Sequence, residues 1–322
     1  MLRVEAITNE AELDRFAPEW QALWRRVGDA TPFQSPDWLL PWWRSFGTQR
    51  PLVLTARAAG RLVGVLPLYR RDEAGCRKVL PIGISLSDYI DALVDRAIPA
   101  VADALLSAIA AQSGWDECHL PGLPPGAALL AAAAPPGLRD HRHQDETCLF
   151  VPLPPLLPRK KRQNLRRAWR ATATAGAASV TLAAPEEVGT AMDALFRLHE
   201  KRWHRRGLPG VCAEEAVRRF HRGAADRLAA SGLLRLYTLA LDGAAVAVLY
   251  GFAAKRIAYA YLCGFDPECA KLGVGTQLLA YAIDEAARAG AREFHFLRGG
   301  ETYKYSWGAL PRPTFARTLR RT

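Results

Sequence analysis

The amino-acid sequence predicts a mixed α/β (α+β) fold built from two similar modules, each a mixed, mostly antiparallel sheet flanked by helices. The first observation is an internal repeat, because residues 55–69 (TARAAGRLVGVLPLY) and 238–252 (TLALDGAAVAVLYGF) match at five aligned positions. Each segment indicates a β-hairpin, since a Gly-containing turn separates two strands rich in Val and Leu. The second observation is the order of elements around each hairpin, which is the same in both halves.

Each half opens with helices, continues through its hairpin to a third strand, and ends with a helix and a last strand. In the first half we expect helices at 10–27 and 36–46, a strand at 78–83, a helix at 100–112 and a strand at 117–120. In the second half we expect helices at 186–206 and 214–231, a strand at 256–264, a helix at 275–289 and a strand at 292–297. The Pro-rich stretch VPLPPLLP at 151–158 cannot be helical. We therefore expect an N-terminal domain of residues 1–150 and a C-terminal domain of residues 151–322.

Composition narrows the class of protein. The longest apolar run, at 244–254, is too short to cross a bilayer of about 30 Å, and the acidic N-terminal segment is unlike a signal peptide, so we expect a cytoplasmic protein. The six cysteines are scattered, and the His and acidic residues at 141–146 do not match metal-site spacings, so we expect neither disulfides nor a metal. The net charge of +11 favours anionic partners. Seven basic residues lie between 159 and 170, which indicates either a solvated helix face or an anion-binding helix.

A glycine loop stands between the strand at 256–264 and the helix that follows. Lys271, Gly273 and Gly275 lie in this loop, and apolar residues recur on one face of the helix after it. Glycines at a strand-to-helix turn let backbone N–H groups approach a phosphate, and the helix N-terminus adds partial positive charge. We therefore expect the backbone of Lys271, Gly273, Val274, Gly275 and Thr276 to hold the diphosphate of coenzyme A. The alternative is that a turn or a helix cap selects these glycines.

This strand–loop–G-x-G–helix–strand segment resembles the acyl-CoA-binding motif of the GNAT acetyltransferase superfamily. Ala270 stands where that motif has Gln or Arg, and Lys271 follows one place later. The segments PFQSPDWLLPWW, LSDYIDALVD, KKRQNLRRAWR, LHEKRW, LYTLALDG, GFDPE and FLRGGETYKYSWG, taken in order, resemble a GNAT-like group of acetyltransferases linked to cellulose biosynthesis. That group is related to the Fem-type peptidyltransferases. The resemblance implies a degenerate GNAT-like module, then a GNAT module that binds acyl-CoA as cosubstrate.

The resemblance also implies roles for particular residues. In GNAT enzymes a backbone N–H of the strand before the glycine loop meets the thioester carbonyl, which places Leu262 and Gly264 in the site. Lys304 resembles a lysine that stabilises charge in the Fem-type relatives, and Tyr303 could protonate the leaving thiolate. Glu301 or Asp88 is the candidate base. The residues expected to contact the acceptor are His199, Arg202, Trp203, Tyr89 and Arg298, although a helix-face histidine satisfied within the fold is an alternative for His199.

Three functions remain open at this point. The first is transfer of an acyl group from acyl-CoA to an amine acceptor, which could be a lipid, a sugar or an envelope precursor. The second is a Fem-type peptidyltransferase that uses aminoacyl-tRNA, with the basic segment holding RNA phosphates; apart from that tRNA we expect no nucleic-acid partner. The third is a non-catalytic partner of a polysaccharide assembly. The basic segment could also attach the protein peripherally to the anionic inner face of a membrane.

Overall fold

The computed structural model describes residues 2–47 and 50–321. The chain divides into two compact units. The first contains the residues up to Thr147 together with those from Arg312 onward, and the second is Cys148–Pro311. The predicted division at 150 and 151 lies close to this boundary, but it placed residues 312–322 in the C-terminal domain. The structure assigns the C-terminal strand to the first unit, because that strand pairs with a strand of the first unit over Glu117–Leu123.

The first unit is a sheet with strand order β1-β2-β3-β4-β6-β13. Its strands are β1 (Leu2–Ile7), β2 (Pro51–Ala58), β3 (Arg61–Glu73), β4 (Cys76–Pro81), β5 (Leu93–Val94, paired with β3), β6 (Glu117–Leu123) and β13 (Leu310–Arg321). Its helices are α1 (Glu10–Arg26), η1 (Pro32–Gln34), α2 (Pro36–Phe46), α3 (Val101–Ala111) and α4 (Ala128–Ala131). Neighbouring strands are antiparallel except β4 and β6, which are parallel.

Side chains along each strand alternate between the two faces of this sheet, and helices cover both faces. Leu52 and Leu54 of β2 belong to one apolar core with Leu105 of α3. Residues of opposite parity point to the other face, where Arg57 of β2 forms an ion pair with Glu19 of α1. Both faces are covered, which explains why β2 and β3 are almost continuously apolar rather than alternating.

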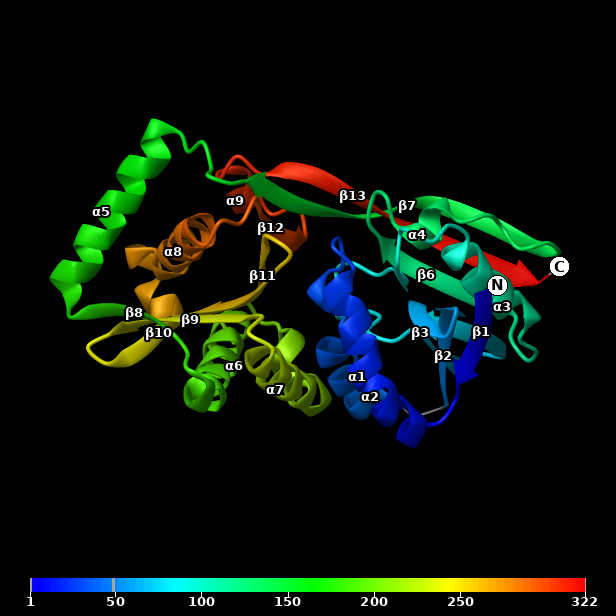
Figure 1. The fold of residues 1–322 in the computed structure, drawn as a ribbon. Helices are drawn as coiled ribbons and strands as arrows, with labels where there is room; N and C mark the ends of the chain where they lie inside the picture. Colours follow the sequence, from blue (N-terminus) through cyan, green and yellow to red (C-terminus); the bar gives the residue numbers. More distant parts are fainter. Residues whose placement is uncertain (1, 48–49, 322) are drawn as a thin grey trace. The chain divides into compact units, whose positions relative to one another are not determined.

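The second unit has strand order β7-β12-β11-β10-β9-β8. Its strands are β7 (Leu138–Pro152, which begins in the first unit), β8 (Ala178–Leu182), β9 (Leu234–Leu241), β10 (Ala244–Ala254), β11 (Ile257–Phe265) and β12 (Glu293–Arg298). Its helices are α5 (Arg159–Ala175), η2 (Pro185–Glu187), α6 (Val188–His204), η3 (Val211–Ala213), α7 (Glu215–Ala230), η4 (Pro267–Leu272), α8 (Val274–Arg288) and α9 (Thr302–Tyr305). Helix α8 covers one face of this sheet, and α6 and α7 cover the other (Figure 1).

The two units repeat one plan, which confirms the predicted fold class. In each, two helices precede an antiparallel hairpin, a third strand follows, and a helix leads to a strand parallel to the third. The predicted helices and central strands agree with the structure to within a few residues. Strands β1, β7, β8 and β13 were not predicted, and His141 and His143 lie on β7.

The described residues contain neither a metal-binding cluster nor a membrane-spanning helix. Across residues 2–47 and 50–321, no group of three His, Cys, Asp or Glu side chains is arranged to hold a metal ion. Over the same residues, no helix is long and apolar enough to span a membrane.

Candidate functional site

Strands β11 and β12 separate partway along their length. They pair in parallel only between Ile257–Tyr259 and Glu293–His295. Strand β11 continues to Phe265 and β12 continues to Arg298, so the second half of each strand has no ladder partner across this edge. The separation opens one edge of β11 at its carboxyl end, where α/β sheets place ligands.

The register of β11 determines which of its amides point to the opened edge. Asp266 donates its amide to the Val246 carbonyl oxygen (2.8 Å), and Val248 pairs with Gly264. Hydrogen-bonded and non-bonded pairs alternate along an antiparallel ladder. The amide of Gly264, and likewise that of Leu262, therefore turns toward β10. The amides of Cys263 and Phe265 turn toward the opened edge.

This corrects part of the expected carbonyl-binding site. Leu262 and Gly264 belong to the β10 ladder, whereas Cys263 is the residue whose backbone donor faces the gap. A β-bulge causes the difference, because the register shifts between Tyr250 and Gly251 and leaves Tyr261 as the extra residue on β11. Bulges are enriched beside active sites, where they redirect backbone groups.

Gly264 has a different role, in helix packing. A Cβ atom at this position would lie 2.8 Å from the Leu195 carbonyl oxygen and 2.9 Å from the His199 amide nitrogen. Both atoms belong to the backbone of α6, so any side chain larger than hydrogen would push the helix away from β11. Gly264 thus allows α6 to lie directly against the strand that borders the site.

The predicted diphosphate loop lies at the start of α8. Gly273 is the N-cap residue with φ of 71°, a left-handed conformation that glycine adopts without strain, and no side chain caps this helix. The first amides of a helix have no intrahelical acceptor, so those of Val274, Gly275 and Thr276 are available for an anion. Gly275 lies close to β11, since a Cβ atom there would meet the Phe265 ring at 3.1 Å. The uncapped helix end and the opened strand edge are therefore neighbours.

Arg202 reaches the opened edge from α6. Its Nη1 donates to the Cys263 carbonyl oxygen at 3.4 Å, and its guanidinium lies over the Phe265 ring, 4.6 Å from the centroid. Burial lowers the pKa of Arg202, and its buried Nε has no hydrogen-bond partner among the described residues. A desolvated cation with an unused donor suits recognition of an acceptor oxygen on a ligand.

Tyr303 and Glu301 complete this group. Tyr303 and Glu301 lie within electrostatic range of the Arg202 guanidinium, and Glu301, Cys263 and Arg202 lie within range of the Tyr303 phenol. Tyr303 is 51% exposed, and partial desolvation of its phenol, followed by the Glu301 carboxylate, raises its pKa to about 12. Tyr303 is therefore a neutral phenol at physiological pH, able to donate a proton and unable to act as a base.

Lys304 is bound within the loop after β12. Its side chain is buried, and its Nζ donates to the carbonyl oxygens of Arg298 (2.5 Å) and Gly299 (3.1 Å). The same ammonium lies 2.8 Å from a carboxylate oxygen of Glu301. An ammonium has three N–H donors, and these oxygen atoms use them. These contacts give Lys304 a structural role in the loop after β12, and its expected role in stabilising reaction charge stays a prediction.

The other residues of this unit that were predicted to bind substrate or cofactor differ in how buried they are. His199 is buried, and desolvation followed by the charge of Arg202 lowers its pKa to about 4, so it is a neutral imidazole. Its Nδ1 has no hydrogen-bond partner among the described residues. Trp203 packs beside the His199 ring, 5.8 Å between centroids, and Arg298 is half-buried at the end of β12. Lys271 is exposed beside the glycine loop.

Asp88 and Tyr89 belong to the first unit. Both side chains are buried, and Tyr89 packs edge-on against Phe33, 6.2 Å between ring centroids. Tyr89 is therefore part of the core of its own unit. The assignment of Asp88 as a base stays a prediction.

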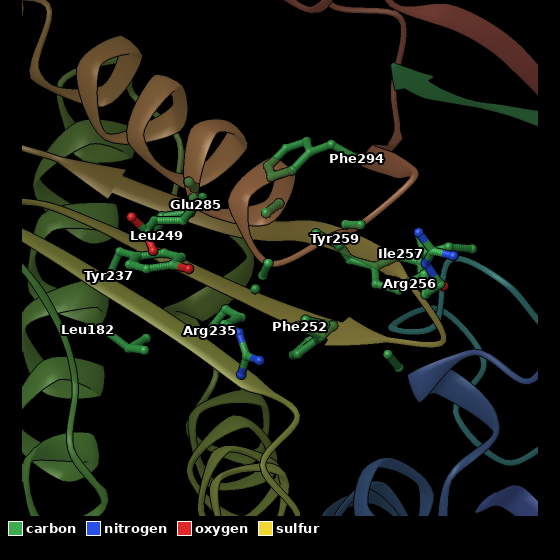
Figure 2. A pocket seen from close by; sticks show the side chains of 18 of the residues that line it. Leu182, Arg235, Tyr237, Leu249, Phe252, Arg256, Ile257, Tyr259, Glu285 and Phe294 are labelled. Carbon is green, nitrogen blue, oxygen red and sulfur yellow. The ribbon is translucent and has the colours of Figure 1, made fainter. Parts of the chain in front are cut away.

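A separate hollow lies at the other end of β11. It has a volume of about 440 Å³ and lies between the sheet and the C-terminal half of α8 (Figure 2). Its floor and wall are small or apolar, with Gly251, Ala258, Ala282 and Ala286 among them, and charged residues such as Arg235 lie at its border. The lining includes the paired part of β11, from Ile257, and contains none of the site residues predicted from the sequence.

Comparison with known proteins agrees with this geometry. Residues 159–305 match the family model described as the acetyltransferase (GNAT) domain. This stretch contains α6, the opened edge of β11, the glycine loop, α8 and the loop after β12. The comparison with curated proteins found no match.

Solved structures share the fold at low sequence identity. FemX is similar with a TM-score of 0.67 and 12% identity, covering 98% of this chain and 96% of that one. The C-terminal domain assigned to a lysylphosphatidylglycerol synthetase of Agrobacterium fabrum is similar with a TM-score of 0.64 and 14% identity, covering 96% of this chain and 92% of that one. A tandem GNAT protein from the clavulanic acid biosynthesis pathway is similar with a TM-score of 0.50 and 15% identity, covering 98% of each chain. These likenesses show a GNAT-type fold.

Proposed function

We propose that the protein is an N-acyltransferase that moves an acyl group from acyl-CoA to an amine acceptor. The observation that carries the proposal is the separation of β11 from β12 beside an uncapped helix N-terminus. The separated strand edge offers a backbone donor for a thioester carbonyl, and the helix end offers donors for a diphosphate. The GNAT family match over residues 159–305 supports the same assignment.

Binding of the donor would use backbone groups. The amides of Val274, Gly275 and Thr276 would hold the diphosphate, with Lys271 beside them. Ala270, which replaces the usual Gln or Arg, leaves these amides in place because they belong to the main chain. The amide of Cys263 would meet the thioester oxygen, and a donor of this kind contributes about 3 kcal/mol to the transition state.

The side chains around the opened edge would handle the protons. The amine nitrogen attacks the carbonyl carbon, a C–N bond forms, and the C–S bond breaks. Tyr303 would give its proton to the departing thiolate, since its phenol is neutral at physiological pH. Glu301 would take the proton that the amine loses. Arg202 would position the acceptor or donor through its unused Nε donor.

The proposed substrate classes are those implied by the resemblance to the GNAT-like, cellulose-linked group of acetyltransferases. We propose a lipid-like, sugar or envelope-precursor amine as acceptor, and a cytoplasmic enzyme that requires no metal. Membership of the cellulose-linked group of acetyltransferases belongs to this proposal as well.

A panel of acyl-CoAs tests the proposal by thiol release, with mass spectrometry to identify the acylated product. Calorimetry with coenzyme A tests the glycine loop separately. Gly275→Val would fill the space between α8 and Phe265, and we expect it to weaken coenzyme A binding at least about tenfold. Ala287→Val, near the other end of α8, is the matched control. Absence of binding by the wild-type protein would overturn the assignment.

A second candidate is a Fem-type transfer from aminoacyl-tRNA. The observation that favours it is the basic helix α5, on which six cationic side chains are exposed. Replacing acyl-CoA by aminoacyl-tRNA in the same product assay separates the two donors. If neither donor is used and neither binds, the third reading, a non-catalytic partner of a polysaccharide assembly, takes their place.

A further inference from the structure

Helix α5 presents a strongly cationic surface. Its 17 residues contain no acidic side chain, and Thr172 is its one buried residue. The exposed basic side chains, here called the α5 basic face, are Arg159, Lys160, Arg162, Arg166, Arg167 and Arg170. Several of them occupy the first turn, where the helix dipole disfavours cations. Cations kept at an unfavourable position indicate a role outside the helix itself.

The opposite side of α5 is attached to the second unit. Leu165 and Trp169 pack against its apolar core, and Thr172 Oγ1 accepts a hydrogen bond of 2.7 Å from the side chain of Gln277 in α8. Lys161 is the one basic residue of the segment that turns inward, since its Nζ lies over the Trp307 ring and donates to Ser306 Oγ. These contacts fix the orientation of the helix, so the α5 basic face points to solvent.

An apolar side chain stands directly before this face. Leu156 is 95% exposed and lies three residues before Arg159. It is the most exposed large apolar residue among those that the structure describes. Leaving a leucine in water forgoes the free energy that its burial would bring. An exposed leucine beside a row of cations is the pattern of a surface that enters the headgroup region of a bilayer.

We propose that Leu156 and the α5 basic face dock the protein on an anionic membrane surface. The cations would contact lipid phosphates, and Leu156 would insert at the boundary of headgroups and acyl chains. This proposal goes beyond the transfer reaction, although it would bring the site to lipid-like amines. Membrane docking and acyl transfer can fail independently, because turnover of a water-soluble amine does not require a membrane.

The same charges could bind RNA, but the apolar component favours the membrane. RNA surfaces combine cations with aromatic rings on which bases stack. Trp169 is the aromatic residue of α5, and it is half-buried against the core. An exposed leucine adds nothing to phosphate recognition, whereas it strengthens membrane attachment.

Flotation with vesicles tests the proposal on the full-length protein. We expect binding to vesicles containing phosphatidylglycerol, weak binding to pure phosphatidylcholine, and a loss of binding as salt rises. Leu156→Ser should weaken partitioning about tenfold, and Leu208→Ser, at a half-exposed leucine elsewhere in the unit, should leave it unchanged. The triple variant Arg159→Gln, Lys160→Gln, Arg162→Gln should weaken it by about fivefold per cation removed.

A charge-matched variant controls for net charge. Arg15→Gln, Arg139→Gln, Arg205→Gln removes the same charge from exposed positions outside α5 and should retain vesicle binding. Equal losses in the two triple variants would reduce the effect to overall charge and overturn the proposal. Binding to tRNA that depends on the α5 cations and is indifferent to Leu156→Ser, without flotation, would assign the surface to RNA instead. Thioester turnover with a soluble amine should be the same in all these variants.

Discussion

The ammonium of Lys304 lies 2.8 Å from a carboxylate oxygen of Glu301, and it also caps the carbonyls at the end of β12. The Lys304 side chain is 3% exposed and that of Glu301 is 56% exposed. The pair therefore holds a partly exposed carboxylate at the border of the opened edge. The lysine organises this loop, and the glutamate remains accessible to a substrate.

Lys304→Met should destabilise the protein by about 2–3 kcal/mol, because it leaves buried carbonyl oxygens without a donor. Glu301→Gln should cost less than about 1 kcal/mol, since that side chain is largely in water. Urea denaturation measures both changes. If Lys304→Met abolished thiol release and left the unfolding free energy unchanged, the lysine would act on the reacting atoms after all.

Tyr303→Phe should lower kcat about 100-fold by removing the proton donor for the thiolate. Because partial desolvation raises the pKa of Tyr303 to about 12, its hydroxyl stays protonated through pH 10. Any alkaline decline of kcat below pH 10 must then come from another group, and the decline should persist in the variant. A pH profile of both proteins checks this. An unchanged kcat in Tyr303→Phe would remove the phenol from the mechanism.

Arg202→Gln should reduce kcat/KM by about 10–100-fold and raise the thermal midpoint. Burial lowers the pKa of this arginine, and its Nε is unpartnered, so the fold bears a desolvation cost to keep the charge in place. Removing such a group relieves the cost at the expense of activity. Calorimetry and steady-state kinetics give the two readouts. A drop in midpoint together with full activity would mean that the guanidinium is structural.

Gly264→Ala should destabilise the protein by about 2–3 kcal/mol, because the new methyl group would meet the α6 backbone. Gly189→Ala, on α6 itself, is the control. Position 189 has no atom within 4 Å of an added Cβ, and alanine there should stabilise by up to about 1 kcal/mol. Equal effects at both positions would contradict the close approach of α6 to β11.

Stability should fall as the pH drops from about 6.5 toward 4. His199 has a folded-state pKa of about 4 and an unfolded value near 6.5, so folding favours its neutral form. The contribution is fully present above pH 6.5 and is lost on approach to the folded pKa, with an upper limit of about 3 kcal/mol. His199→Leu should reduce this slope in urea titrations at a series of pH values. Part of the slope should remain, because burial also lowers the pKa of His221, to about 3.

Much of the fold was predictable because it depends on local patterns. The hairpins at 55–69 and 238–252, α3 and α8 follow from turn residues and apolar periodicity within one segment. Strands β7 and β13 were missed for a physical reason. Their residues at 138–147 and 310–313 are mostly polar or Pro. The two strands lie next to each other in the sheet, between β6 and β12, and all these neighbours are distant in sequence.

The candidate site was predictable by region and only partly by role. The structure brings the glycine loop, Tyr303, Glu301 and Arg202 to or near the opened edge of β11, and the roles expected of them stay predictions. Cys263 was not singled out because its amide direction depends on a bulge. Without that bulge the hairpin closed by Ala254 and Ile257 would turn the Cys263 amide toward β10.

The sequence by itself determined the repeated order of helices and strands, the position of the glycine loop and the row of cations at 159–170. Those features depend on which residue types follow one another along the chain. The tertiary structure alone decided that Lys304 points into the loop after β12, that the Cys263 amide faces the gap, and that Leu156 stays in water. Each of these depends on the register and packing of segments that meet only in the folded protein, where a one-residue shift reverses the direction of every backbone donor.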